Sequence, residues 1–106
     1  MDWVKVFENS TTARQTLVND RPQLVIIGSR RICLVLHNNS LLAIEDKCSH
    51  NGESLSKGTV NYLGEVICPW HGYRFNLKTG RESGERSRDL STFPMKENED
   101  GVFIGI

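Results

Sequence analysis

Two short motifs, each containing one cysteine and one histidine, constrain this chain more than any other feature. They are Cys48-Ser49-His50-Asn51-Gly52 and Cys68-Pro69-Trp70-His71-Gly72, and each follows a segment with the residue pattern of a β-strand. Seventeen residues separate His50 from Cys68, which is enough for the chain to leave one loop and return beside it. The spacing therefore predicts two neighbouring loops that bring two thiols and two imidazoles together, and such a set of groups binds metals.

Two kinds of metal centre are compatible with this donor set. Two cysteines and two histidines hold a single zinc ion in many small domains. They also hold a [2Fe–2S] cluster in which two histidines replace two cysteines on one iron. Zinc fingers normally place a histidine pair on a helix after a cysteine pair, whereas here each half contributes one of each, and Pro69 disfavours a helix in the second half. The pattern favours the iron–sulfur cluster and leaves zinc as the alternative.

The composition is that of a small protein with no strong net charge. The 106 residues contain 13 basic and 13 acidic side chains, which gives no support to nucleic-acid binding. No apolar run approaches the roughly 18 residues that a membrane helix needs, and the N-terminus lacks the pattern of a secretory signal. The three cysteines are more typical of metal or redox chemistry than of disulfides. We expect one domain spanning residues 1–106, located in the cytoplasm, without nucleic-acid or membrane partners.

The rest of the sequence predicts short strands separated by turns. Residues 11–18 have the pattern of one or two helical turns, with Ser10 or Thr11 as the N-cap. Residues 81–89 are almost wholly polar and predict a solvated loop, and Glu97 is expected in a surface turn. The segments with a strand pattern are 3–7, 23–27, 31–36, 41–45, 65–67, 73–77 and 101–106. Many short strands punctuated by Gly and Asn indicate an antiparallel all-β barrel or sandwich.

Together with their surroundings, the two motifs resemble the loops of Rieske iron–sulfur proteins, which read C-x-H and C-x-x-H. The similarity continues through Leu42–Lys47 before the first loop, Leu55–Gly58 between the loops and Gly72–Gly80 after the second. It covers roughly residues 23–106. The resemblance implies an all-β Rieske fold, in which antiparallel sheets form a partly open barrel and two loops form a cluster-binding subdomain.

The resemblance also implies the roles of the four metal-binding side chains. In this family the cysteines bind the inner iron and the histidines bind the outer, more exposed iron. Cys48 and Cys68 thus match the first role and His50 and His71 the second, with one [2Fe–2S] cluster per chain. Two ferric ions, two sulfides and two thiolates sum to zero charge, and neutral imidazoles add nothing. Histidine ligation therefore favours reduction more than four thiolates would.

Among Rieske proteins, the loops resemble those of soluble ferredoxins that serve ring-hydroxylating oxygenases and those of related nitrite-reductase small subunits. The resemblance implies an electron carrier without catalytic residues of its own, reduced by a flavoprotein reductase and oxidised by a terminal oxygenase. A small subunit of a nitrite-reductase-like complex is the second hypothesis, and a zinc-binding interaction module is the third. Only His37 lies outside the two motifs, so the chain lacks the residues for a second iron site that activates oxygen.

Respiratory Rieske proteins have features that this sequence lacks. Glu53 and Trp70 occupy the positions of their two additional loop cysteines, so the disulfide between the loops is absent. Tyr73 and Phe75 occupy the positions of a serine and a tyrosine whose hydroxyls donate to cluster and cysteine sulfurs. Phenylalanine has no donor, and the hydroxyl of Tyr73 is too far along its ring to copy the serine. We expect a reduction potential near the low end of the Rieske range, about −150 mV.

Several other residues have simpler interpretations. Cys33 lies among apolar strand residues and is expected to be a small buried side chain. His37 is expected to end a hairpin strand, and Trp3 is expected in the core. Trp70 and Tyr73 are interpreted either as loop packing or as a contact for a redox partner, because transient redox interfaces are small.

Overall fold

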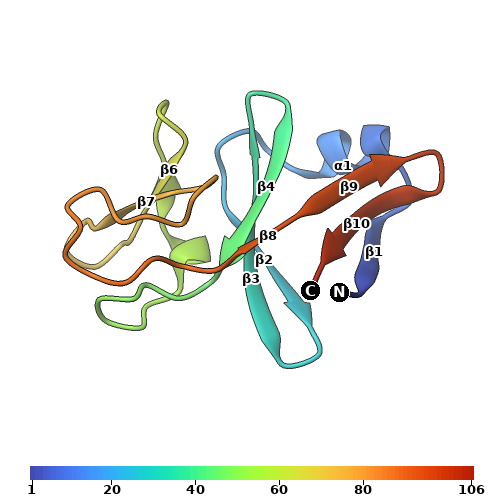
Figure 1. Ribbon diagram of the computed structural model, residues 1–106. Coiled ribbons are helices and arrows are strands. Elements are labelled where there is room, and N and C mark those ends of the chain that lie inside the picture. The colour runs from blue at the N-terminus through green and yellow to red at the C-terminus, as the bar shows by residue number, and fades with distance from the viewer.

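The computed structural model describes all 106 residues, and most of its elements are strands of three antiparallel sheets (Figure 1). The first sheet has the order β1–β10–β9, the second β2–β3–β4–β8 and the third β5–β6–β7. The strands are β1 (Trp3–Phe7), β2 (Gln23–Ile27), β3 (Arg30–His37), β4 (Ser40–Glu45), β5 (Thr59–Val60), β6 (Glu65–Ile67), β7 (Arg74–Asn76), β8 (Thr92–Phe93), β9 (Met95–Asn98) and β10 (Gly101–Gly105). The helices are α1 (Ser10–Thr16) and the short 3₁₀ helix η1 (Leu55–Lys57).

Strands β3 and β4 form the predicted hairpin at the centre of the second sheet. Its turn consists of Asn38 and Asn39, whose φ angles are 48° and 65°. Asparagine is one of the few residues besides glycine that adopts this left-handed conformation readily, and two such residues in succession suit a tight hairpin. As expected, His37 ends β3, where it pairs with Ser40.

Strand β3 is buried on both faces and contributes to two hydrophobic cores. Successive side chains of a strand point to opposite faces, so Cys33 and Val35 enter one core while Ile32 and Leu34 enter the other. The first, here called the loop-side core, lies under the third sheet and includes side chains of β6, β7 and η1. The second lies under α1 and β10. The two cores therefore share one central sheet.

The all-β class is confirmed, and the three sheets do not close into a barrel. The third sheet and its loops lie at one end of the molecule, on the left in Figure 1, and the first sheet and both termini lie toward the other. No helix has the length and apolar character needed to cross a membrane.

Three local predictions were wrong. The N-cap of α1 is Asn9, whose side-chain oxygen accepts the Thr12 N–H at 2.7 Å. Glu97 lies within β9 and not in a turn, and its carboxylate pairs with Arg14 at 2.6 Å. Trp3 is 40% exposed, on the same solvent-facing side of β1 as Lys5.

Candidate metal centre

The two motifs form two loops that are closed in the same way. The first loop follows β4 and the second connects β6 to β7. In each, the backbone N–H of the cysteine donates to the carbonyl oxygen five residues later: Cys48 to Glu53 and Cys68 to Tyr73, both at 2.8 Å. Gly52 and Gly72 precede these acceptors with φ angles of 79° and 71°, a conformation that suits glycine. Each cysteine is thereby fixed at the base of its loop.

The four predicted metal-binding residues lie together at this end of the molecule. Cys48 is 0% and Cys68 1% exposed, whereas His50 and His71 are both exposed. The two imidazole centroids are 5.5 Å apart. The thiol of Cys68 also contacts the first loop, where it donates to Asn51 Oδ1 at 3.9 Å. The donors are thus sorted by type, with sulfurs inside and imidazoles outside.

Burial raises the pKa of the Cys68 thiol, and the neighbouring Cys48 raises it further. The Cys68 thiol resists ionisation because its thiolate would lose solvation in this apolar core. A bound metal supplies the missing positive charge, so binding at this site releases protons.

The backbone of the second loop is strained at one of the predicted ligands. His71 has a φ angle of 69° and is followed by Gly72 in a similar conformation. A non-glycine residue in this region costs roughly 1–3 kcal/mol, and such residues are concentrated at functional sites. The strain at His71 is therefore consistent with a binding role for its side chain.

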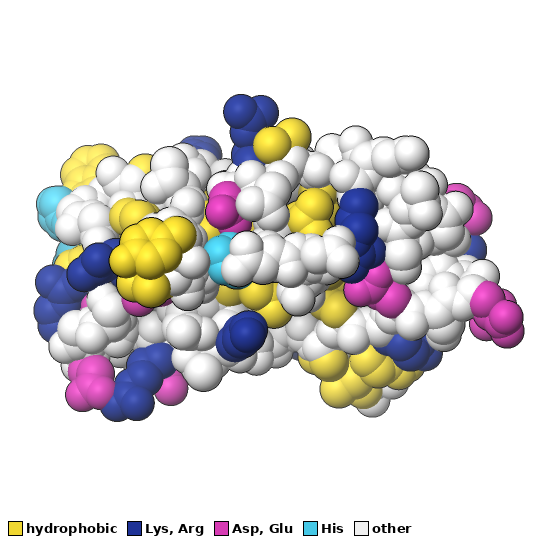
Figure 2. Space-filling view, turned by 90° about the horizontal axis from the view of Figure 1, so that it is seen from above, with side chains coloured by type: hydrophobic (Ala, Val, Ile, Leu, Met, Phe, Trp, Pro, Cys, Tyr) yellow, Lys and Arg dark blue, Asp and Glu magenta, His cyan; other side chains and the backbone are white.

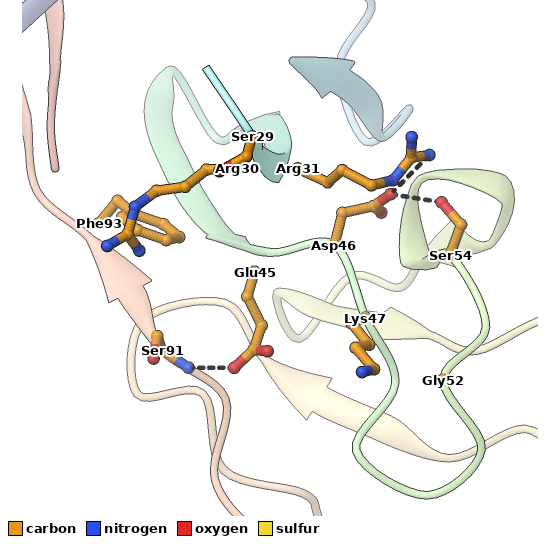
Figure 3. Close-up of a pocket in the computed structure, with 10 residues that line it drawn as sticks. All are labelled: Ser29, Arg30, Arg31, Glu45, Asp46, Lys47, Gly52, Ser54, Ser91 and Phe93. Carbon is orange, nitrogen blue, oxygen red and sulfur yellow. Dashed lines mark hydrogen bonds and ion pairs between the residues drawn. The ribbon is translucent and has the colours of Figure 1, made fainter. Parts of the chain in front are cut away.

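Asp46, directly after β4, bonds the segment that follows the first loop (Figure 3). Its side chain is 0% exposed and accepts hydrogen bonds from the Ser54 hydroxyl and from the Ser56 N–H, the latter at 2.6 Å. Arg31 lies 3.7 Å away and supplies a compensating charge. Sequence reasoning missed this network, because Ser54 and Ser56 lie too far along the chain from Asp46 for the usual local patterns of side chains that bond nearby backbone.

Glu45 likewise bonds the segment between the third sheet and β8. Its carboxylate receives both arms of the Arg88 guanidinium at 2.9 and 3.0 Å and the Ser91 N–H at 2.8 Å. These bonds lower the pKa of Glu45, with Arg88 as the main cause. The acidic residues around the loops therefore already have structural partners.

The largest pocket, of about 490 Å³, lies beside the first loop but includes none of the four predicted ligands. Figure 3 shows its lining: Ser29, Arg30, Arg31, Glu45, Asp46, Lys47, Gly52, Ser54, Ser91 and Phe93. Since Glu45 and Asp46 serve the scaffold, we assign the pocket no part in metal binding.

The two aromatic residues of the second loop have different surroundings. Tyr73 stacks on His50, with the ring centroids 4.0 Å apart and the planes within 8°. Trp70 meets His71 edge-on at 5.8 Å and remains 57% exposed. Tyr73 therefore packs within the site, while Trp70 is free to contact another molecule. Figure 2 shows histidine at the surface at this end of the molecule, with Lys and Arg side chains close by.

The sequence predicted a solvated loop for the polar segment 81–89, and this prediction was wrong for Glu82. Glu82 is 0% exposed, and its pKa is lowered to about 2, first by hydrogen bonds from Arg86 and then by the N–H groups of Gly84 and Arg86. The sequence signal was the Glu-Arg spacing of four residues with a glycine between them, which allows a side chain to fold back on its own loop.

The remaining cysteine and histidine do not join the four. Cys33 is 0% exposed on β3, where burial raises the pKa of its thiol, so its interpretation as a buried apolar residue is confirmed. His37 is 8% exposed and its Nδ1 lies 2.6 Å from Asp20 Oδ1.

Comparison with known proteins agrees with this geometry. Residues 2–94 match the model of the Rieske [2Fe–2S] domain. The chain is 38% identical to apoptosis-inducing factor 3 of Homo sapiens over 89 residues, which are 83% of this chain but only 14% of that protein. It is 30% identical to the 3-phenylpropionate/cinnamic acid dioxygenase ferredoxin subunit of Photorhabdus laumondii over 76 residues, 71% of this chain and 72% of the relative.

A solved structure with the same fold is described as a complex of reduced oxygenase and oxidized ferredoxin in carbazole 1,9a-dioxygenase. The matched chain aligns with a TM-score of 0.80 and 27% identity, over 97% of this chain and 92% of its own length.

Proposed function

This chain belongs to the Rieske [2Fe–2S] domain family, and on that premise we propose that it carries single electrons from a flavoprotein reductase to a terminal oxygenase. The relatives that it matches over most of their length are ferredoxin components of dioxygenase systems and of an alkene monooxygenase system. One solved relative is itself described in a complex with its oxygenase. Because the chain spans only 14% of the human relative, that protein's other properties are not transferred.

We propose that Cys48 and Cys68 bind the inner iron and that His50 and His71 bind the outer iron. The observation that carries this assignment is the sorting of the donors: both thiols are buried and both imidazoles are exposed. Such a division suits a cluster whose two irons have different ligands, and it is less expected for a single zinc ion surrounded by four donors. When bound, the cluster accepts and releases one electron.

The chain's own residues would control where that electron leaves. The two sulfurs belong to the loop-side core, together with Phe75 and Leu55, and this apolar layer excludes water from the inner side of the site. The imidazoles reach the surface, so a partner can approach the outer side closely. Trp70 offers an apolar contact there because more than half of its side chain is exposed. No acid or base is required of these residues for electron transfer.

We further propose that residues 1–106 act as one domain, because β3 and β4 supply side chains to both cores. A cytoplasmic location is part of the proposal. It is supported by the three cysteines, all of which are free thiols in this structure, as is usual in a reducing compartment.

The decisive experiment is the metal content of protein purified anaerobically from iron-replete cells. We expect two irons and two acid-labile sulfides per chain and a red-brown colour. The variants His50→Ala and His71→Ala should lose the iron, the sulfide and the colour. Cys33→Ser is the matched control and should retain the cluster. Equimolar zinc without iron or sulfide would overturn the assignment. If the chain instead purifies in a tight complex with a large reductase subunit, it is a fixed subunit of that complex and not a mobile electron carrier.

A further inference from the structure

Glu82 is a fully buried acidic side chain near the metal centre, and residues of its own segment donate hydrogen bonds to its carboxylate. Its side chain is 0% exposed. Its carboxylate accepts the Gly84 N–H at 2.6 Å and the Arg86 N–H at 2.8 Å. Its backbone forms a β-bridge with Phe75 of β7. The carboxylate is therefore fixed relative to the second loop.

This carboxylate holds the side chain of Arg86 in one orientation. Arg86 Nε and Nη2 each donate to a different oxygen of Glu82, both at 3.1 Å. A two-armed contact of this kind fixes the plane of a guanidinium as well as its position. The Arg86 Cζ atom consequently lies 3.7 Å from the centroid of the Tyr73 ring. That distance is well within the range of a cation–π contact.

The Tyr73 ring in turn lies against His50. Their centroids are 4.0 Å apart and their planes are inclined by 8°. Two groups this close to one ring centroid cannot occupy the same face, so Arg86 and His50 lie on opposite faces of Tyr73. The result is a continuous stack in which a buried carboxylate holds a guanidinium, the guanidinium covers a phenol ring, and the ring covers an imidazole.

The same segment also holds the backbone beside His50. The hydroxyl of Ser49 lies 2.8 Å from the carbonyl oxygen of Arg88 and 2.9 Å from the hydroxyl of Ser87. His50 is therefore held through its ring on one side and through its chain neighbour on the other. By contrast, the neighbouring pair Arg81–Glu85 has the same spacing, but both of its side chains are more than 60% exposed.

We propose that Glu82 and Arg86 are positioning residues for His50, which fix its imidazole through Tyr73 and set the charge beside the outer side of the cluster. The inference rests on the proposed role of His50 as a ligand. In the wild type the two charges compensate each other. Removing either one leaves the other uncompensated near the site where the electron is added, so the two removals act in opposite directions.

The test is the midpoint potential of cluster-loaded variants, measured by protein-film voltammetry alongside iron and sulfide content. Arg86→Gln leaves a carboxylate that opposes reduction, so the potential falls. Glu82→Gln leaves a guanidinium that favours reduction, so the potential rises. The double variant returns toward the wild type, and Arg86→Lys, which keeps the charge, reverses most of the fall. Arg81→Gln is the matched control and leaves the potential unchanged.

A merely structural role would not produce shifts of opposite sign. If Arg86→Gln and Glu82→Gln shift the potential in the same direction, or by no more than Arg81→Gln, the inference is wrong. If Glu82→Gln does not retain its cluster, the three arginine variants still test the inference. It requires the midpoint potential of Arg86→Gln to be lower than those of Arg86→Lys and Arg81→Gln. A wild type without iron and sulfide would contradict the proposed function instead, so the two failures are distinguishable.

Discussion

We expect the substitution Phe75→Tyr to raise the reduction potential of this protein. Phe75 is 0% exposed and belongs to the loop-side core, which also contains Cys48 and Cys68. Its ring offers no donor to either sulfur. Tyr73 does not compensate, because its ring is held between His50 and Arg86. The wild type therefore lacks both of the hydroxyl donors that high-potential Rieske proteins use. Its reduction potential should be about −150 mV.

The size of the change follows from what the added hydroxyl contacts. If it donates to a cysteine sulfur, it stabilises the reduced state more than the oxidised state, because the sulfur then carries more negative charge. A difference of about 1 kcal/mol, typical of one hydrogen bond, corresponds to roughly 40 mV for a one-electron couple. If the hydroxyl finds no acceptor, its burial costs about 1–3 kcal/mol of folding free energy.

Protein-film voltammetry measures the potential, and urea unfolding measures the free energy of folding. Phe103→Tyr is a suitable control, because that ring lies in β10 with Lys96 5.0 Å away and should not affect the potential. An unchanged potential in Phe75→Tyr, together with a lower free energy of unfolding, would refute the placement of Phe75 at the donor position. A wild-type midpoint above about +100 mV would refute the hydrogen-bond argument as a whole.

Three further predictions use single substitutions. Cys33→Ser should retain the cluster but lower the free energy of unfolding by about 1–3 kcal/mol, as urea titration would show, because it buries a hydroxyl. Trp70→Ser should slow electron transfer to the physiological partner in stopped-flow assays while the visible absorption stays nearly constant; an unchanged rate would remove Trp70 from the docking surface. The pKa of Glu82 is lowered to about 2, chiefly by Arg86, so its contribution is fully present above the unfolded pKa near 4.5 and is lost as the pH falls toward 2. Since Arg86 is half exposed, we expect only about 0.2–1 kcal/mol after screening; the stability difference between the wild type and Glu82→Gln should shrink over this pH range, and a constant difference would contradict the assignment.

The sequence predicted the parts of this protein that depend on local rules. The β3–β4 hairpin depends on two asparagines that accept a left-handed backbone, and this requirement is visible in the chain. The loops bearing Cys48 and Cys68 could be recognised because metal-binding side chains occur at fixed spacings. The cysteine of β3 could be interpreted from its apolar neighbours alone.

The parts that the sequence did not predict depend on how segments pack against one another, which local residue patterns do not indicate. The spacing of Glu82 from Arg86 is visible in the sequence, but the burial of Glu82 arises only when its loop folds back along β7. The strands β5 and β8 contain two residues each and have no periodicity of their own; pairing with β6 and β4 defines them. Trp3 was expected in the core because it is large and apolar, but it lies on the same face of β1 as Lys5, and that face is exposed.

The position of the chain ends has a consequence for how such a unit can be used. Asp2 and Ile106 exchange two backbone hydrogen bonds, of 2.8 and 2.9 Å, so the two ends lie side by side, away from the loops that carry the histidines (Figure 1). A polypeptide fused to either end would therefore begin on the side opposite the redox surface and leave it uncovered. A short linker could also join the ends for circular permutation. The unit can thus be joined to a larger protein at either end, and the length of the linker would set how far its histidine-bearing loops reach.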